Sequence, residues 1–256
     1  MSLDPAAEPF YADAAPAAED GQRVGVLLIH GFTGSPASIV PWGRHLAAQG
    51  LGVAVPRLPG HGTTWQELNR TRWTDWYGEV DRTFDKLRAN CDQVVVGGLS
   101  MGGGLALQLA ADRGREVAGV AVVNAAVHTD RKDVLALPVL KFMVSSFPGI
   151  ANDIKKPGVE EHGYTRTPLK AAHSMMSAWR TLLEDLPKVT QPLLVFRSVE
   201  DHVVDPSSAA LIRGRVSSRD LTERLLENSY HVATLDNDAA EIFEESTRFI
   251  RRVTGP

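Results

Sequence analysis

The stretch VVVGGLSMGGGLALQLAA, residues 94–111, places a single serine, Ser100, between two runs of different character. The run before the serine is short, apolar and rich in valine, which is typical of a buried β-strand. The run after it is rich in leucine and alanine, which favour a helix. The stretch therefore predicts a strand, a tight turn at the serine and a helix.

Glycines surround this serine in the pattern Gly98-Leu99-Ser100-Met101-Gly102, and two more glycines follow. A turn of this kind lifts the serine hydroxyl above the edge of a sheet, and only glycine lets strand and helix approach so closely. Each glycine inside the helix costs about 1 kcal/mol relative to alanine. The free N–H groups and positive dipole of the helix N-terminus would face the same site. We predict that Ser100 is a nucleophile; the alternative is a glycine-rich turn with an incidental serine.

Similar apolar runs recur along the chain, and they lie at residues 24–31, 51–62, 92–100, 117–127 and 191–198, with a weaker one at 221–229. Most of these runs lack in/out alternation, which indicates strands buried on both faces of a parallel sheet. Helical patterns lie between them. The alternation predicts an α/β fold, with a mostly parallel central sheet flanked by helices and a site at the carboxyl ends of the strands.

One interval, residues 128–167, breaks this alternation with proline and glycine and carries a cluster of large apolar residues. The cluster consists of Leu135, Leu137, Val139, Leu140, Phe142, Met143, Phe147 and Ile150. Connections of this length are often lids over active sites. We predict a core of residues 1–127 and 168–256, beginning with a polar tail at 1–22, and a small cap at 128–167 inserted after the sixth strand. The apolar cluster also fits the core of an ordinary small subdomain.

The composition is ordinary for one globular domain: of 256 residues, 43% are hydrophobic and 23% charged. A net charge of −4 provides no basic surface, which argues against a nucleic-acid partner. No apolar run approaches the ~18 residues of a transmembrane segment. The single cysteine, Cys91, excludes an internal disulfide, and no signal-peptide pattern is present, so we predict a cytoplasmic location.

A serine hydroxyl needs a base, and the base needs a carboxylate; in this architecture the chain order is serine, acid, histidine. Of the eight histidines, His231 lies in a loop after the last strand candidate and before the final helical run. We predict that His231 is the base.

The acid should follow a buried strand, and Asp201 and Asp205 both lie past the run at 191–198, Asp201 sooner than Asp205. We predict that Asp201 accepts a hydrogen bond from His231 Nδ1. Asp205 remains an alternative, although its position before a proline is typical of a turn. Asp236 and Asp238 are interpreted as solvated loop or helix-start residues.

Backbone N–H groups are needed to stabilise the oxyanion of the tetrahedral intermediate. One should come from Met101, directly after the nucleophile, and the other from the HGFTG loop at residues 30–34, where we choose Phe32. The alternative for this loop is a plain turn with a buried phenylalanine.

With these residues in place, the chain resembles the α/β-hydrolases, and more narrowly the bacterial monoacylglycerol lipases and related carboxylesterases. The segments that carry the resemblance are GVLLIHGFTGSP (25–36), VPRLPGHGTT (55–64), GLSMGG (98–103), NDIKKPGVEEHGY (152–164), SVEDHVVDP (198–206) and LENSYHVATLDND (226–238). The resemblance implies ester hydrolysis by Ser100, Asp201 and His231, with Phe32 and Met101 as oxyanion donors. It also implies no cofactor and no metal.

The resemblance further implies a cap whose apolar outer face can meet lipid aggregates. In similar lipases a cap glutamate binds the glycerol end of the substrate, and by position this residue is Glu161; a solvated pair with Glu160 is the alternative. The implied reaction releases glycerol and fatty acid from a monoacylglycerol through an acyl-enzyme.

Other functions remain open. A short-chain carboxylesterase, a thioesterase or an amidase would use the same triad. The fold also serves as a non-catalytic ligand receptor, which has no need of all three residues. A zinc hydrolase is disfavoured because His30 and His61 have no ligand set at metal spacing; both are expected to shape loops instead.

Overall fold

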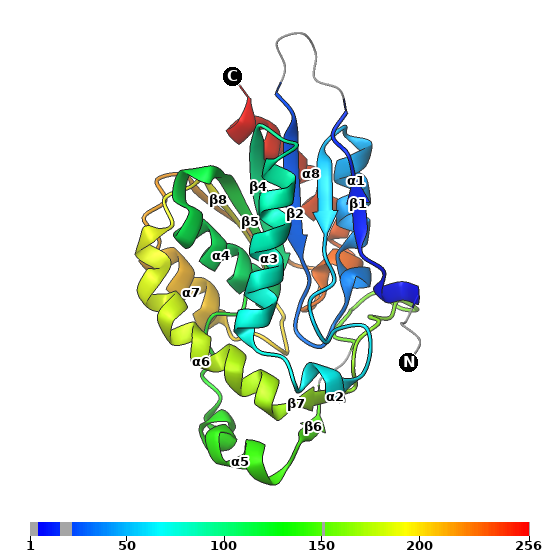
Figure 1. The fold of residues 1–256 in the computed structure, drawn as a ribbon, viewed down its shortest axis with the longest axis vertical. Helices are drawn as coiled ribbons and strands as arrows, with labels where there is room; N and C mark the ends of the chain where they lie inside the picture. The colour runs from blue at the N-terminus through cyan, green and yellow to red at the C-terminus, as the bar shows by residue number, and fades with distance from the viewer. Residues whose placement is uncertain (1–4, 16–21, 150–151, 256) are drawn as a thin grey trace.

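The computed structural model describes residues 5–15, 22–149 and 152–255. A seven-stranded sheet forms its centre, in the order β1-β3-β2-β4-β5-β8-β9 (Figure 1). These strands are β1 (Phe10–Ala12), β2 (Val24–Ile29), β3 (Gly52–Val55), β4 (Gln93–Leu99), β5 (Val117–Val123), β8 (Leu193–Ser198) and β9 (Leu221–Leu226). All neighbouring pairs are parallel except β1 with β3, which confirms the predicted, mostly parallel sheet.

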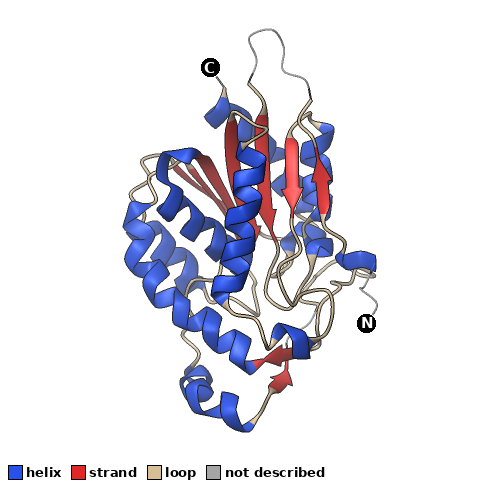
Figure 2. Ribbon diagram, viewed as in Figure 1, coloured by secondary structure: helices blue, strands red, loops and turns tan. Residues whose placement is uncertain are grey.

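Helices cover both faces of the sheet (Figure 2). The longer helices are α1 (Val40–Ala48), α3 (Trp73–Arg88), α4 (Met101–Arg113), α6 (Leu169–Asp185), α7 (Pro206–Arg215) and α8 (Ala239–Thr254), and the short ones are α2 (Trp65–Leu68) and α5 (Leu137–Met143). One apolar core lies under α3, α4 and α6, and a second lies under α1 and α8. Central strands are buried on both faces, which explains their continuous apolar sequences.

The N-terminal segment differs from the predicted polar tail. β1 pairs antiparallel with β3, with Phe10 opposite Val55 and Ala12 opposite Val53. Ala7 is also buried. β1 has only three residues, too few to show the apolar pattern of a strand in the sequence. This edge strand is stabilised by its backbone pairing with β3. Residues 1–4 and 16–21 of the predicted tail lie outside the described residues.

The described residues of the 128–167 segment lie beyond the carboxyl ends of the parallel strands, with α5 and β6 at the bottom of Figure 1. They contain a 3₁₀ turn (Lys132–Ala136), α5, β6 (Ser146–Pro148) and the start of β7 (Arg166–Pro168), which pairs antiparallel with β6. The segment follows β5, the fifth strand described and not the sixth, because β1 alone precedes β2 in the described chain.

The apolar cluster of this segment is mostly exposed. Leu135, Val139, Phe142 and Met143 are all more than half exposed, with Phe142 at 78%, whereas Leu137 packs against α6. Ile150 lies outside the described residues. In the described part of the chain, no helix combines the length and the apolar character that crossing a membrane would require.

Candidate active site

Ser100 lies between the end of β4 and the first turn of α4, with φ 56° and ψ −119°. A positive φ at a residue other than glycine costs about 1–3 kcal/mol and persists only where the surroundings impose it. Here the Ser100 N–H donates to the Val123 carbonyl at 2.9 Å, and the Ser100 carbonyl accepts from the N–H of Gly103 at 2.9 Å and of Ala126 at 3.0 Å. The backbone of β5 therefore fixes the strained turn.

The glycines around Ser100 leave no room for a side chain. A Cβ on Gly102 would lie 2.0 Å from the carbonyl oxygen of Ile29, the last residue of β2. A Cβ on Gly98 would lie 2.3 Å from the carbonyl of Gly102, and one on Gly103 would lie 2.6 Å from the Cβ of Ala125. These distances confirm that the glycines serve the close approach of strand and helix.

His231 follows β9, and its side chain is 8% exposed. Its Nδ1 lies 2.9 Å from Oδ2 of Asp201, which follows β8. The other carboxylate oxygen of Asp201 accepts the N–H groups of Val203 at 2.8 Å and Val204 at 2.9 Å. The strand ends thus bring Ser100, His231 and Asp201 to the same edge of the sheet.

Asp205, the alternative acid, has another place in the structure. It precedes α7, and its Oδ2 accepts the Thr129 hydroxyl at 2.8 Å and the Asp130 N–H at 3.0 Å. Asp205 therefore joins α7 to the chain that follows β5, and it does not meet His231.

The pair has opposed pKa shifts. Burial disfavours the charged His231 ring, but the charge and hydrogen bond of Asp201 outweigh it, so the pKa of His231 is raised. Burial also disfavours the Asp201 carboxylate, but the charge of His231 and three hydrogen bonds hold its pKa below the ordinary value. A carboxylate and an imidazolium that stabilise each other are the electrostatic arrangement of a general base and its acid.

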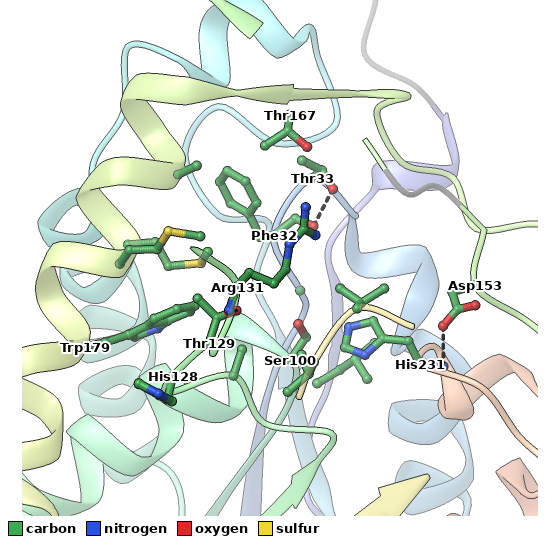
Figure 3. Close-up of a pocket in the computed structure, with 18 of the residues that line it drawn as sticks. Phe32, Thr33, Ser100, His128, Thr129, Arg131, Asp153, Thr167, Trp179 and His231 are labelled. Carbon is green, nitrogen blue, oxygen red and sulfur yellow. Dashed lines mark hydrogen bonds between the residues drawn. The ribbon is translucent and has the colours of Figure 1, made fainter. Parts of the chain in front are cut away.

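A cavity opens between these residues and the 128–167 segment. In Figure 3 the Ser100 hydroxyl lies beside the His231 ring, with Trp179, His128 and Thr129 on the opposite side of Ser100. The apolar side chains that line the cavity include those of Phe32, Leu99, Val134, Ala172, Met175, Met176, Val203, Val204 and Val232. Ser100 itself is 8% exposed, and this cavity gives a substrate access to it.

The HGFTG loop packs directly against the serine. A Cβ on Gly31 would lie 3.4 Å from the Ser100 Cβ. His30, fully buried, holds the loop: its Nε2 accepts the Leu58 N–H at 3.2 Å and its Nδ1 donates to the Gly31 carbonyl at 3.0 Å. Burial lowers the pKa of His30 to about 4, so the ring is neutral and keeps this pattern. His30 therefore shapes the loop, as the sequence predicted.

Two backbone donors are available beside Ser100. Among the hydrogen bonds formed by the described residues, none uses the N–H of Phe32 or of Met101. Phe32 directly follows Gly31, which packs against Ser100, and Met101 directly follows Ser100 in the chain. Free N–H groups in such positions suit a developing oxyanion.

Glu161 lines the cavity from the 128–167 segment. One carboxylate oxygen lies against Gly34, where a Cβ would approach it to 2.6 Å. Asn152, at φ 62°, accepts the Glu161 N–H at 2.7 Å and so fixes this part of the chain. Burial raises the pKa of Glu161, the charge of His231 opposes the shift, and Asp153 adds to it. The Glu161 carboxylate lines the cavity on the side of His231, where a ligand can reach it.

Sequence reasoning missed three polar residues that hold the site. Asn124, buried after β5, donates to Ser198 Oγ at 2.9 Å and to the His231 carbonyl at 2.8 Å. Asp153 accepts the His231 N–H at 3.1 Å. Asp236, interpreted above as solvated, is only 2% exposed and accepts the N–H groups of Lys155 and Tyr230. Their partners lie far away in the sequence, so only the position of Asn124 at the end of an apolar run gave a signal.

Comparisons with known proteins identify the family of the chain. Residues 21–238 match the family Hydrolase_4, described as "Serine aminopeptidase, S33". A thermostable monoacylglycerol lipase of Bacillus sp. (strain H-257) is 38% identical over 97% of this chain and 96% of its own, and a carboxylesterase of Bacillus subtilis (strain 168) is 26% identical over 89% and 92%.

Solved structures give the same result. A structure from a study of two metagenome-derived lipolytic enzymes has a TM-score of 0.92 and 39% identity, covering 98% of this chain and 100% of that one. The monoacylglycerol lipase of Paleococcus ferrophilus shares the fold, with a TM-score of 0.77 at 17% identity over 99% and 100% of the two chains. The chain therefore belongs to this α/β-hydrolase family of serine hydrolases.

Proposed function

We propose that this protein hydrolyses monoacylglycerols to glycerol and fatty acid, with Ser100 as nucleophile, His231 as base and Asp201 as acid. The observation that carries the proposal is the hydroxyl of Ser100, held on a strained turn inside a largely apolar cavity beside the His231–Asp201 pair. The names of the similar proteins, a monoacylglycerol lipase and a carboxylesterase, support an ester as the substrate.

The reaction would proceed in two halves. Ser100 Oγ attacks the ester carbonyl while His231 Nε2 takes its proton, and the N–H groups of Phe32 and Met101 hold the oxyanion. The imidazolium, stabilised by Asp201, then protonates the departing glycerol oxygen and leaves an acyl-serine. Water activated by His231 attacks this ester, the proton returns to Ser100 and the fatty acid leaves.

The two ends of the substrate would occupy chemically different walls. Met175, Met176 and Trp179 offer an apolar wall for the acyl chain. This wall continues through Val134, Ala172 and Met176 into an apolar groove lined by Leu137, Leu140, Phe147 and Leu169, which suits a long chain. Glu161 would accept the glycerol hydroxyls.

Replacing Glu161 by alanine is expected to erase the preference for a glycerol ester. A buried hydrogen bond from a hydroxyl to a carboxylate contributes about 1.5–3 kcal/mol, so kcat/KM for monoacylglycerols should fall about 10- to 100-fold. Matched methyl esters carry no glycerol hydroxyls and should be hydrolysed at nearly unchanged rates. The measurement is kcat/KM on 1-monoacylglycerols and methyl esters of equal chain length, from short to long.

Glu160→Ala is the matched control, because Glu160 is an exposed neighbouring carboxylate. It should change neither series. If wild-type protein hydrolyses both series equally and Glu161→Ala changes nothing, the protein is a general carboxylesterase, and the monoacylglycerol assignment is wrong.

The pH profile should show an acid limb set by His231. The base must be neutral to accept the serine proton, so kcat/KM falls as the pH drops through the pKa of His231 in the free enzyme. Because Asp201 raises this pKa against the effect of burial, the limb should have its midpoint above the ordinary histidine value of 6.5. Initial rates from pH 5 to 9, each corrected with a Ser100→Ala blank, test this; a midpoint at or below 6.5 would contradict the assignment.

We also propose that residues 128–167 act as a cap whose exposed apolar side chains meet lipid aggregates. Leu135, Val139 and Phe142 are exposed close to the apolar groove described above, which would let an acyl chain pass from an aggregate towards Ser100.

A cytoplasmic location is part of the proposal as well: Cys91 is buried and unpaired, which suits a reducing compartment.

A further inference from the structure

Asp153 lies outside the predicted triad, yet its carboxylate, 9% exposed, meets both loops that carry the acid and the base. Oδ2 accepts the backbone N–H of His231 at 3.1 Å and of His202 at 3.2 Å. Oδ1 accepts from the His202 ring, whose Nδ1 lies 2.7 Å away. Figure 3 shows Asp153 on the far side of His231 from Ser100, with its bond to the His231 backbone.

The backbone around Asp153 is fixed to the same loops. The Asp153 carbonyl accepts the Val232 N–H at 3.1 Å. Two residues after Asp153, the N–H of Lys155 donates to the Asp236 carboxylate at 2.6 Å. The same carboxylate accepts the Tyr230 N–H at 2.9 Å. The backbone of Asp153 and of Lys155 is therefore fixed by hydrogen bonds. Because Asp153 has a fixed position, its carboxylate can hold the backbone groups that it binds in a fixed position as well.

We propose that Asp153 is a positioning residue for catalysis: one carboxylate sets the His231 backbone relative to the Asp201–His202 turn. His202 directly follows Asp201, so the shared oxygen fixes the spacing over which the 2.9 Å bond between His231 and Asp201 forms. Asn152, the neighbour of Asp153, binds the backbone of Glu161, which lines the cavity. The same short segment therefore positions both the base His231 and the residue proposed to bind glycerol. The inference rests on the catalytic roles proposed above.

The charged groups around Asp153 affect the pKa of His231, so the role of Asp153 can be tested by the pH dependence of the reaction. His231 faces the carboxylates of Asp201, Glu161 and Asp153, and all three raise its pKa. His202 faces Asp153 and Glu200, and its hydrogen bond and attraction to Asp153 raise its pKa above the ordinary value. Lys155 lies 3.7 Å from Glu200 and over the Tyr230 ring. A protonated His202 therefore offsets part of the Asp153 charge that His231 senses.

Asp153→Asn should lower kcat by about 10- to 100-fold, with a much smaller change in KM, because a misplaced base slows chemistry more than binding. It should also move the acid limb of kcat/KM to lower pH, because a charge that raises the His231 pKa is lost.

His202→Ala should move the same limb in the opposite direction. It removes the ring that offsets the Asp153 charge when protonated, while the backbone N–H of residue 202 can still bind the carboxylate. General loosening of the site would reduce the rate without shifting the limb in opposite directions in two variants. Glu200→Gln, at an exposed carboxylate of the same cluster, is the control and should stay within about twofold of wild type.

Full pH profiles of the three variants on one monoacylglycerol, with thermal melting to establish folding, test the proposal. It is overturned if Asp153→Asn retains wild-type kcat and limb, or if both variants shift the limb in the same direction. Should Asp153→Asn fail to fold, the upward shift in His202→Ala decides, and its absence counts against the proposal. Ser100→Ala separates the two levels: activity that persists there removes the proposed mechanism itself.

Discussion

Ser100→Ala is expected to lower kcat/KM for every ester by about 10⁴-fold or more, to the level of a blank. The variant loses the atom that forms the acyl-enzyme, while His231 and Asp201 keep their own contacts. Residual hydrolysis would come only from water held near the oxyanion donors. Folding should persist, because the bonds that hold residue 100 in its turn are formed by its backbone.

The measurement pairs initial rates with covalent labelling by a fluorophosphonate. Wild-type protein should take up one label at Ser100, located by peptide mass spectrometry, and Ser100→Ala should take up none. Ser217→Ala removes an exposed serine that does not line the described cavity, and it should keep full rate and label. Hydrolysis that survives in Ser100→Ala, or a label on another residue, would refute the mechanism.

The candidate site was largely predictable because its main residues follow local signals. Ser100, Asp201 and His231 each follow the end of a strand, and parallel strands bring their carboxyl ends to one edge of a sheet. The glycines flanking Ser100 were readable for the same reason, since a strand and a helix joined by so short a turn must approach closely. Periodicity and chain order carry this information without any knowledge of distant partners.

Other features could not be read because they depend on contacts far away in the sequence. β1 exists by pairing with β3, and Asp236 is buried because the Lys155 and Tyr230 backbones meet there. Asp153 resembles any loop aspartate until the fold brings it to His231. Glu161 rested on resemblance alone, and only the fold places its carboxylate against Gly34. A buried carboxylate and a solvated one have the same one-letter code, and tertiary structure alone separates them.

The turn that carries Ser100 should be a place where the fold tolerates little change. A Cβ at position 102 would lie 2.0 Å from the Ile29 carbonyl oxygen and 2.7 Å from that of His30. Both are backbone atoms of the strand end and the oxyanion loop, so relief requires α4 and β2 to separate. Gly102→Ala should therefore destabilise the protein by about 3 kcal/mol or more, although alanine favours helices.

For a chain of this size, that loss corresponds to a fall in Tm of about 6–12 °C. Any folded Gly102→Ala protein should also lose kcat by about 100-fold or more, because Ser100 and the HGFTG loop would be displaced from each other. Thermal melting and kcat on the same preparation measure both. Gly78→Ala is the matched control: Gly78 lies inside α3, its nearest neighbour would be the flexible tip of Arg82 at 3.4 Å, and alanine there should stabilise by about 0.5–1 kcal/mol. Equal Tm and kcat in the two variants would mean that strand and helix do not meet as closely as the glycines around Ser100 indicate.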